Sequence, residues 1–148
     1  MKSINDIQDE IIEEFSHLRG DLDMCVEYLI ELGKKINPLS DEFRIEENTV
    51  KGCQSKVWLV ANYRHGTINF MADSNTMITK GLVGMLLRVL SAQKPGDILK
   101  SDLYFIHKIG MNRFIGTQRT NGFAAMIKQM KLYALAFATK EGQPKEVP

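Results

Sequence analysis

The residue with the clearest chemical potential is Cys53, which lies in the polar stretch Lys51-Gly52-Cys53-Gln54-Ser55-Lys56. The preceding glycine leaves the backbone unhindered, so the thiol can project from a loop. A thiol reacts only as the thiolate, and nearby cations lower its ordinary pKa of about 8.5. We therefore expect Lys51 and Lys56 to lower the pKa of Cys53 if both point toward it. Free cysteines are usually buried and inert, but a polar loop around this one favours a functional thiol.

The second cysteine, Cys25, falls on the apolar face of a predicted helix, and we interpret it as a small core residue. A disulfide between Cys25 and Cys53 would need close Cα spacing and an oxidising compartment, and a cytosolic setting disfavours it. Two cysteines without a Cys/His cluster cannot by themselves build a zinc or iron–sulfur site. The sequence therefore predicts neither a metal nor a cofactor.

Three other polar residues need separate interpretation. His107 falls in an ambiguous segment, so a Cys53–His107 dyad of the hydrolase kind stays open, although no local signature supports it. Arg119 stands just before a predicted helix and, by position alone, is a surface arginine. By the same reasoning, Asp73 is first of all a helix cap.

Two helices are expected before the Cys53 loop. Ser3 and Asp6 resemble a capping box, and apolar residues at helical spacing then continue to a stop at Gly20. Asp21 is the predicted cap of the second helix. The buried stripe predicted for that helix consists of Leu22, Cys25, Leu29, Leu32 and Ile36.

The middle of the chain changes to strand-like patterns. We expect strands at residues 49–51, 57–63 and 67–72, the last two joined by a short loop whose Gly66 can adopt positive φ. Three strands in succession imply an antiparallel meander. Cys53 then lies in the loop between the first strand and the second.

Helical spacing returns after the cap-forming run Asp73-Ser74-Asn75 and continues to Val89, with Gly81 and Gly84 predicted to allow close packing on a neighbour. Residues 98–115 are interpreted as one or two short helices. A final helix is expected from about Thr120 to Thr139. This order predicts an α+β, two-layer fold in which helices cover one side of a three-stranded antiparallel sheet.

Length and composition fit one compact domain of 148 residues, 44% hydrophobic and 25% charged. The formal net charge is +1, from 19 basic and 18 acidic residues, so no basic footprint for nucleic acid or an anionic membrane is present. No apolar run reaches bilayer length, and the first residues lack the apolar core of a signal peptide. We therefore expect a cytoplasmic protein that binds neither nucleic acid nor membrane.

The stretch Asn48-Thr49-Val50-Lys51-Gly52-Cys53-Gln54-Ser55-Lys56-Val57-Trp58 resembles the N-x-V-x-G-C-x-S-x-V-W signature of the SufE family of sulfur-acceptor proteins. Further matches follow in family order: Tyr28 to Gly33, Asp73-Ser74, Lys80-Gly81-Leu82, Arg119 to Phe123 and Ala125-Met126. The resemblance spans most of the chain. It predicts one SufE-like domain over residues 1–139. Residues 140–148 are charged and contain two prolines, which predicts a frayed tail.

The resemblance implies a function and a site. SufE proteins take persulfide sulfur from a pyridoxal-phosphate-dependent cysteine desulfurase (SufS- or CsdA-like), stimulate that enzyme, and deliver the sulfur to a SufBCD-type scaffold for iron–sulfur cluster assembly. Cys53 would be the persulfide carrier, with Asp73 and Arg119 at polar positions around the carrier loop or partner surface. The protein would be an accessory carrier, not an enzyme, with a fold similar to the IscU-type scaffold, and a homodimer stays open.

Two departures from the family pattern concern the polar positions. Asn75 stands where the family often has an acid, and Gly116-Thr117-Gln118 replaces a stretch that often contains proline. These departures weaken the assignment of Asp73 and Arg119 but not that of Cys53. Three other functions remain open: an IscU-like scaffold, a thiol-nucleophile enzyme and a simple interaction module.

Overall fold

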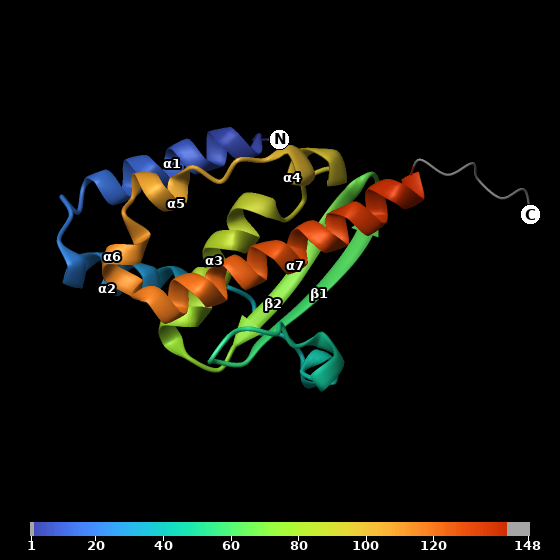
Figure 1. Ribbon diagram of the computed structural model, residues 1–148, viewed down its shortest axis with the longest axis horizontal. Helices are drawn as coiled ribbons and strands as arrows, with labels where there is room; N and C mark the ends of the chain where they lie inside the picture. Colours follow the sequence, from blue (N-terminus) through green and yellow to red (C-terminus); the bar gives the residue numbers. More distant parts are fainter. Residues whose placement is uncertain (1, 142–148) are drawn as a thin grey trace, which may run out of the picture.

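The computed structural model describes residues 2–141. In chain order its elements are α1 (Ile4–Ser16), α2 (Leu22–Lys34), the 3-10 helices η1 (Asp41–Phe43) and η2 (Glu46–Asn48), β1 (Val57–Arg64), β2 (Thr67–Ser74), α3 (Met77–Leu90), α4 (Pro95–Lys100), α5 (Phe105–Lys108), α6 (Met111–Ile115) and α7 (Thr117–Glu141). The predicted α+β class is therefore confirmed. In Figure 1, α7 lies along the β1–β2 hairpin, whereas α2 and α6 gather at the end away from the hairpin turn.

The two N-terminal helices begin where their caps predict. The Ser3 side chain accepts from the Asp6 amide, and the Asp6 carboxylate accepts from the Ser3 amide, which completes a capping box. Asp21 Oδ1 accepts from the Met24 amide at 3.0 Å and begins α2. Within the predicted α2 stripe, the prediction for Leu22 is wrong. Leu22 is 44% exposed at the first residue of α2.

The sheet has two strands, not three. β1 and β2 pair antiparallel from Val57 opposite Ser74 to Arg64 opposite Thr67. The strand predicted at residues 49–51 is reduced to one bridge, in which the Val50 amide donates to the Val57 carbonyl at 2.8 Å. A longer ladder cannot form, because η2 ends immediately before Thr49 and the chain turns away at Gly52, whose φ is +94°. The hairpin turn uses positive φ at His65 and Gly66, as expected for a two-residue connection.

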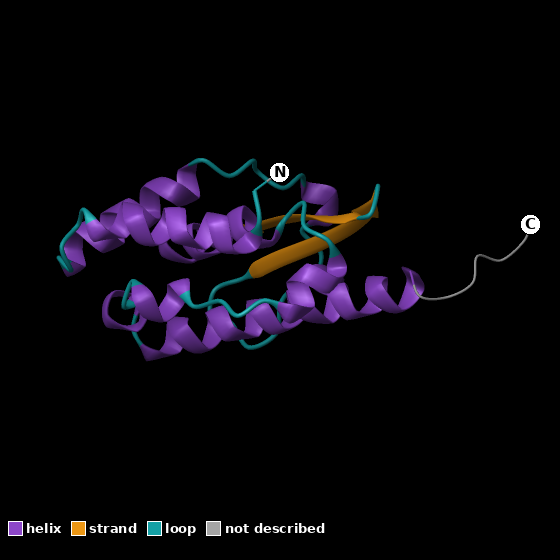
Figure 2. Ribbon diagram, turned by 90° about the horizontal axis from the view of Figure 1, so that it is seen from above, coloured by secondary structure: helices purple, strands orange, loops and turns teal. Residues whose placement is uncertain are grey.

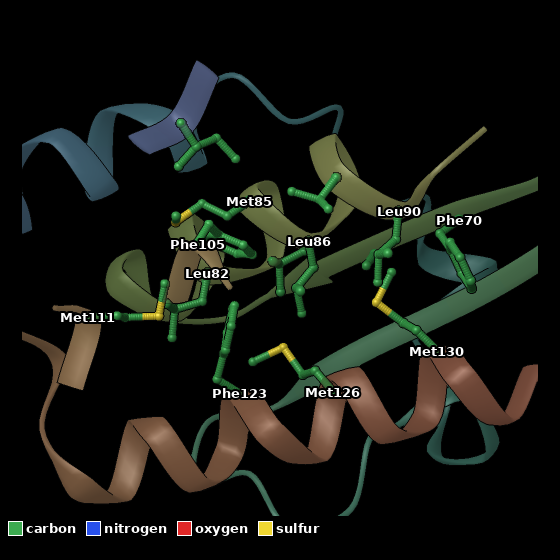
Figure 3. Close-up of a cluster of buried hydrophobic side chains, with 14 of the residues drawn as sticks. Phe70, Leu82, Met85, Leu86, Leu90, Phe105, Met111, Phe123, Met126 and Met130 are labelled. Carbon is green, nitrogen blue, oxygen red and sulfur yellow. The ribbon is translucent and has the colours of Figure 1, made fainter. Parts of the chain in front are cut away.

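A large part of the core lies between the hairpin, α3 and α7, and the other α-helices of the described residues add buried side chains to it. On the hairpin, Tyr63 stacks on Phe137 with ring centroids 5.3 Å apart, and Phe70 meets Tyr133 edge-on. Figure 3 shows side chains of α7 pointing toward those of α3: Phe123, Met126 and Met130 on one side, and Leu82, Leu86 and Leu90 on the other. Figure 2 shows α7 running along one side of the hairpin. Because α7 begins at Thr117, three residues before the predicted start, its first turns extend beyond the hairpin to the Cys53 loop.

The last predicted segment is only partly described. Lys140 and Glu141 belong to α7, so the helix extends two residues beyond its predicted end. The rest of the tail predicted at residues 140–148 lies outside the described residues.

None of the helices within residues 2–141 combines the length and the apolar character that a membrane span requires.

Glycines bring α2 and α3 into close contact, as the sequence predicted for Gly81 and Gly84. A Cβ atom on Gly33 of α2 would lie 2.7 Å from the amide nitrogen of Gly81, and one on Gly81 would collide with the carbonyl of Leu29. A Cβ on Gly84 would come within 3.0 Å of Ile36. The backbones of the two helices therefore touch, and this contact fixes where α3 begins relative to the Cys53 loop.

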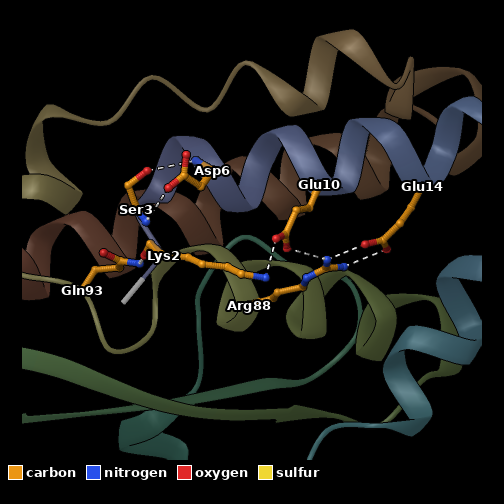
Figure 4. Close-up of polar contacts among 7 residues, drawn as sticks. All are labelled: Lys2, Ser3, Asp6, Glu10, Glu14, Arg88 and Gln93. Carbon is orange, nitrogen blue, oxygen red and sulfur yellow. Dashed lines mark hydrogen bonds and ion pairs between the residues drawn. The ribbon is translucent and has the colours of Figure 1, made fainter.

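A charged cluster joins α1 to α3. Arg88 of α3 donates to Glu14 through both terminal guanidinium nitrogens and lies 3.5 Å from Glu10 (Figure 4). Lys2 pairs with the other oxygen of Glu10, and Tyr28 of α2 donates to Glu14. The Arg88 hydrogen bonds, and secondarily Tyr28, hold the pKa of Glu14 below its usual range against the opposing effect of burial.

Candidate functional site

Cys53 lies in the loop between η2 and β1, as predicted, and the base of this loop is fixed to the end of β2. The Lys56 amide donates to Asn75 Oδ1 at 3.0 Å, and the Ser74 hydroxyl donates to the Lys56 carbonyl at 2.8 Å. At the other end, the Val50 amide bonds to β1. Residues 51–55 are therefore the part of the loop that lies between these two anchors.

The loop rests on the first turns of α7. The thiol of Cys53 donates to the carbonyl of Gly122 with Sγ 3.4 Å from the oxygen. A Cβ added at Gly122 would lie 3.5 Å from Sγ, which is ordinary van der Waals contact, so the approach does not depend on glycine at this position. Gly52 of the loop packs against the next turn of α7, where a Cβ added to Gly52 would lie 3.3 Å from Ala125. The half-buried thiol is thus held against a helix that is distant in sequence.

A cavity of about 340 Å³ opens beside the thiol. Its apolar wall is formed by Leu82 of α3, Ile115 at the end of α6 and Met126 of α7. The polar groups that line it come from the loop, from α3 and from the α6–α7 junction: Gln54, Ser55, Thr79, Thr117, Gln118 and Arg119. The cavity therefore combines a sulfur nucleophile, an apolar wall and several hydrogen-bond donors.

The electrostatics of the thiol differ from the expectation. Burial raises the pKa of Cys53, and neither Lys51 nor Lys56 contributes to the shift, so the condition for the expected lowering is not met. Lys51 instead places its Nζ 2.6 Å from Glu46 and 3.0 Å from the Thr49 hydroxyl. At rest, Cys53 is a protonated thiol whose hydrogen points to a carbonyl.

Arg119 lines the same cavity as Cys53. It lies in the first turn of α7, and its Nη1 donates to the Ile115 carbonyl at 3.2 Å, across the α6–α7 junction. The guanidinium is thus held at the cavity wall by backbone contact. It is not among the causes that shift the pKa of Cys53.

Asp73 does not line the cavity, and its contacts are those of a structural anchor. The fully buried carboxylate accepts from the amides of Leu39 (3.2 Å) and Ser74 (2.8 Å). It also pairs with Arg44 at 2.6 Å and Lys80 at 3.4 Å. Burial alone would raise the pKa of Asp73, but the two amides and then the two cations hold it below its ordinary value. Interpreting Asp73 as a helix cap is wrong, since Thr76 occupies the N-cap of α3.

The segment before the loop is fixed by the same carboxylate. Arg44, which bonds to Asp73, also donates to the Leu39 carbonyl at 3.0 Å and lies 5.1 Å above the ring of Trp58. A guanidinium over an indole face is an attractive arrangement. Asp73 thereby ties residues 39–44 to β1 and β2, outside the Cys53 cavity.

The remaining candidates lie elsewhere. His107 is exposed on α5 and does not line the Cys53 cavity. Cys25 is 3% exposed within α2, as predicted for a core residue. Among residues 2–141, no group of three or more His, Cys, Asp or Glu side chains is placed to hold a metal ion.

A larger cavity of about 890 Å³ lies between the end of α2, residues 35–43, β2 and α3. Its lining is mostly apolar, with Glu14 and Arg88 at one end already bonded to each other. Cys53 does not line it. We place the candidate site at the smaller cavity, because the more exposed of the two thiols opens into it.

Ser55, Thr79 and Gly122 are among the residues of the site that the sequence did not predict. Ser55 lies within the cysteine motif and was not singled out, whereas Thr79 and Gly122 come from α3 and α7. The spacing Cys53-Gln54-Ser55 was the only available signal for Ser55. The approach of Thr79 and Gly122 depends on the packing of helices remote from the motif, which no local pattern reports.

Comparison with known proteins agrees with the signature. Residues 9–134 match the SufE family, described as an Fe-S metabolism associated domain. An uncharacterised SufE-like protein of Synechocystis is 33% identical over 128 residues, which are 86% of this chain and 80% of the relative. A SufE-like protein of Rhizobium etli is 36% identical over 128 residues, covering 83% of this chain and 86% of the relative.

A solved structure shares the fold. The solution structure of a hypothetical protein from Thermus thermophilus superposes with a TM-score of 0.70 and covers 90% of this chain and 96% of its own, at 19% identity. At this level of identity the likeness concerns the fold alone. The family match and the sequence relatives carry the assignment: the chain belongs to the SufE family and has that family's accessory role in iron–sulfur metabolism, as a sulfur acceptor.

Proposed function

We propose that Cys53 carries sulfur as a persulfide between two partner proteins. The donor is a pyridoxal-phosphate-dependent cysteine desulfurase, which this protein stimulates by removing its sulfur, and the recipient is a SufBCD-type scaffold that assembles iron–sulfur clusters. The observation that carries the proposal is the position of Cys53, a thiol in a loop beside a cavity large enough for a further sulfur atom.

The transfer is a thiol–persulfide exchange. Cys53 Sγ attacks the terminal sulfur of the donor persulfide, a new S–S bond forms on Cys53, and the S–S bond in the donor breaks. The bonding electron pair stays with the donor cysteine, which takes the proton that Cys53 loses. No external oxidant or reductant is needed, since one thiol and one persulfide enter and leave. In the unloading step, a recipient thiolate attacks the Cys53 persulfide in the same way.

The resting geometry favours transfer only within a complex. A half-buried thiol whose pKa is raised and which bonds to the Gly122 carbonyl is mostly protonated near neutral pH, and a thiol must ionise to attack. Oxidation also proceeds through the thiolate, so the same contact protects the free carrier. Docking of a donor that draws the loop away from α7 would remove the carbonyl contact and release the nucleophile.

The competing functions have less support. An IscU-like scaffold needs several converging ligands, and no such cluster of His, Cys, Asp or Glu occurs in the part of the chain that the structure describes. A cysteine hydrolase needs a base near the thiol, and His107 does not line the Cys53 cavity. A sulfur carrier needs neither a cluster of metal ligands nor a base near the thiol.

The test is intact-mass spectrometry of the protein after incubation with a cysteine desulfurase and free cysteine. We expect the mass of one sulfur atom on the wild type, reversed by a reducing thiol, and faster desulfurase turnover in its presence. Cys53→Ser should show neither effect. Cys25→Ser is the matched control and should retain both. A wild-type chain that gains no sulfur under these conditions would rule out the proposed function.

A further inference from the structure

Three hydroxyl groups form a chain beside the carrier cysteine. Thr79 Oγ1 of α3 donates to Ser55 Oγ at 3.2 Å, and Ser55 Oγ shares a hydrogen bond of 2.8 Å with Thr76 Oγ1. Ser55 and Thr79 line the cavity together with Cys53. Thr79 is only 5% exposed, so its hydroxyl is a buried group of the cavity wall. The sulfur exchange described above does not require these three hydroxyl groups.

Both threonines bond to Ser55 and do not make the hydrogen bond that a threonine at their helix position usually makes. Thr76 occupies the N-cap of α3, where a threonine oxygen ordinarily accepts from a backbone amide of the first turn, but it makes no such side-chain cap. Thr79 lies inside α3, where a threonine hydroxyl commonly bonds back to its own helix. Here its hydroxyl crosses to the Cys53 loop. The two contacts therefore fix the position of one oxygen, that of Ser55.

The Ser55 hydroxyl keeps its own hydrogen for the cavity when Thr76 is the donor in the hydrogen bond that the two hydroxyls share. A serine hydroxyl has two acceptor sites and one donor. When Thr79 and Thr76 both donate to Ser55, its acceptor sites are filled and its own hydrogen is free. Ser55 lines the same cavity as the thiol and is separated from it by one residue. Its hydrogen can therefore point to a group that enters the cavity.

The group that needs this hydrogen is the terminal sulfur of a loaded carrier. Once Cys53 has accepted sulfur, Sγ bears no proton and the bond to the Gly122 carbonyl is lost. A sulfur anion beside that carbonyl would be repelled, whereas the cavity offers space and donors. Its apolar wall of Leu82, Ile115 and Met126 disfavours an anion unless a donor compensates. Arg119 is the charged side chain of the lining, and its Nη1 is engaged with the Ile115 carbonyl at 3.2 Å.

We propose that Ser55 donates a hydrogen bond to the terminal sulfur of the Cys53 persulfide and holds it in the cavity as an anion. Thr79 and Thr76 are positioning residues that keep the Ser55 oxygen in place. The inference rests on the proposed function in one respect, that Cys53 is the residue that carries sulfur. It adds the group that recognises the sulfur after it arrives.

The test measures the ionisation of the persulfide directly. The protein is loaded with inorganic polysulfide in place of a desulfurase, and the alkylation rate of the persulfide is followed against pH. A hydrogen bond to a charged group is strong, so we expect Ser55→Ala to raise the apparent pKa of the persulfide by about one to two units. Thr79→Val should move it in the same direction by less. Ser55→Thr and Thr79→Ser keep the hydroxyls and should restore the wild-type profile.

The control is Thr120→Val, which removes a hydroxyl from the same end of α7. Thr120 donates to the Gly116 carbonyl at 2.8 Å and does not line the cavity, so its loss should leave the profile unchanged. Unfolding curves identify any variant that fails to fold, and whichever of Ser55→Ala and Thr79→Val folds then decides the question. A wild-type profile for both Ser55→Ala and Thr79→Val would overturn the inference while the carrier function stands. A wild-type chain that loads from neither polysulfide nor desulfurase would instead remove the carrier function itself.

Discussion

The reactivity of Cys53 is set by neighbours that carry no charge. Burial raises the pKa of the thiol, and the carbonyl of Gly122 accepts its proton, while Lys51 is engaged with Glu46. A thiol with a raised pKa is mostly protonated near neutral pH, and thiolate formation limits both alkylation and oxidation. We therefore expect the Cys53 thiol of the free protein to react slowly, and the proposed sulfur transfer to depend on a partner.

The two cysteines should separate function from stability. Cys53→Ser should abolish sulfur acceptance with little change in the free energy of unfolding, because the side chain lies at a cavity edge. Cys25→Ser should leave acceptance intact and cost about 1–3 kcal/mol, since it puts a hydroxyl among the apolar residues of α2. Urea unfolding and intact-mass analysis measure the two effects. The reverse pattern would mean that Cys25 is the carrier.

Arg119 is expected to act on the partner and not on the resting thiol. Its guanidinium lines the Cys53 cavity, but it does not shift the pKa of that thiol. Arg119→Ala should therefore leave the alkylation rate of free Cys53 unchanged and slow desulfurase-coupled loading about tenfold or more, as for loss of a charge-assisted hydrogen bond. Slower alkylation of the free protein would show instead that Arg119 favours the thiolate. Wild-type values for both rates would remove Arg119 from the site.

At the scale of elements, α3 makes two separate sets of contacts. One surface packs on α2 through glycine contacts, and its N-terminal end supplies Thr76 and Thr79 to the Cys53 loop. Because protein interiors are close-packed, a shift of α3 against α2 moves both sets of contacts together. The position of the cavity wall is thus linked to a helix contact outside the cavity.

Gly81→Ala should be strongly destabilising, because the added Cβ would collide with the backbone carbonyl of Leu29 and backbone cannot move aside cheaply. We expect a loss of about 3 kcal/mol in the free energy of unfolding, at the upper end for overpacking. Gly96→Ala is the matched control, since nothing lies within 4 Å of a Cβ there, and it should be neutral or slightly stabilising. Equal midpoints of urea unfolding for the two variants would contradict the tight α2–α3 contact.

At the scale of the whole molecule, a few buried or half-buried charges hold segments that are distant in sequence. Arg88 joins α3 to α1 through Glu10 and Glu14, and Asp73 joins β2 to residues 39–44 through Arg44. The carboxylates in both clusters have pKa values below their ordinary range. The fold as a whole should therefore lose stability in acid.

The direction of this pH dependence follows from the difference in carboxylate pKa between the folded and the unfolded protein. A carboxylate whose pKa is depressed by folding stabilises the fold above its unfolded pKa, about 4, and this stabilisation is lost as the pH falls through the folded value. We expect constant stability from pH 7 to about 5 and a decline below about 4. Arg88→Met should cost about 1–3 kcal/mol at pH 7 and weaken the acid dependence, because Glu14 loses the partner that depresses its pKa.

Lys34→Met provides the control for this variant. It breaks the exposed ion pair with Glu31, whose two side chains are 64% and 62% exposed, and such pairs contribute little. Urea unfolding at a series of pH values compares the two variants with the wild type. Superimposable pH curves for Arg88→Met and the wild type would show that the α1–α3 cluster does not contribute to acid sensitivity.

The sequence alone determined the family, the helix caps and the hairpin turn. The Ser3 capping box, the Asp21 cap and the positive φ at Gly66 are all decided within a few residues, so their signals are local. The motif around Cys53 was likewise sufficient to place the thiol in a loop before β1. Local patterns wrongly predicted a strand at residues 49–51. The pairing of these residues with β1 depends on how the chain continues after Gly52, and it is limited to one bridge.

Only the tertiary structure decided the state of the thiol and the contacts of the residues around it. The pKa of Cys53 rises through burial, and α7 brings Gly122 against the thiol from 69 positions away, which the neighbouring lysines could not indicate. Asp73 is a buried anchor because Arg44 reaches it across the fold. Ser55 is held by two hydroxyl contacts because α3 turns two threonines toward it. Burial and partner geometry are properties of packed elements, so they become visible only when remote segments meet.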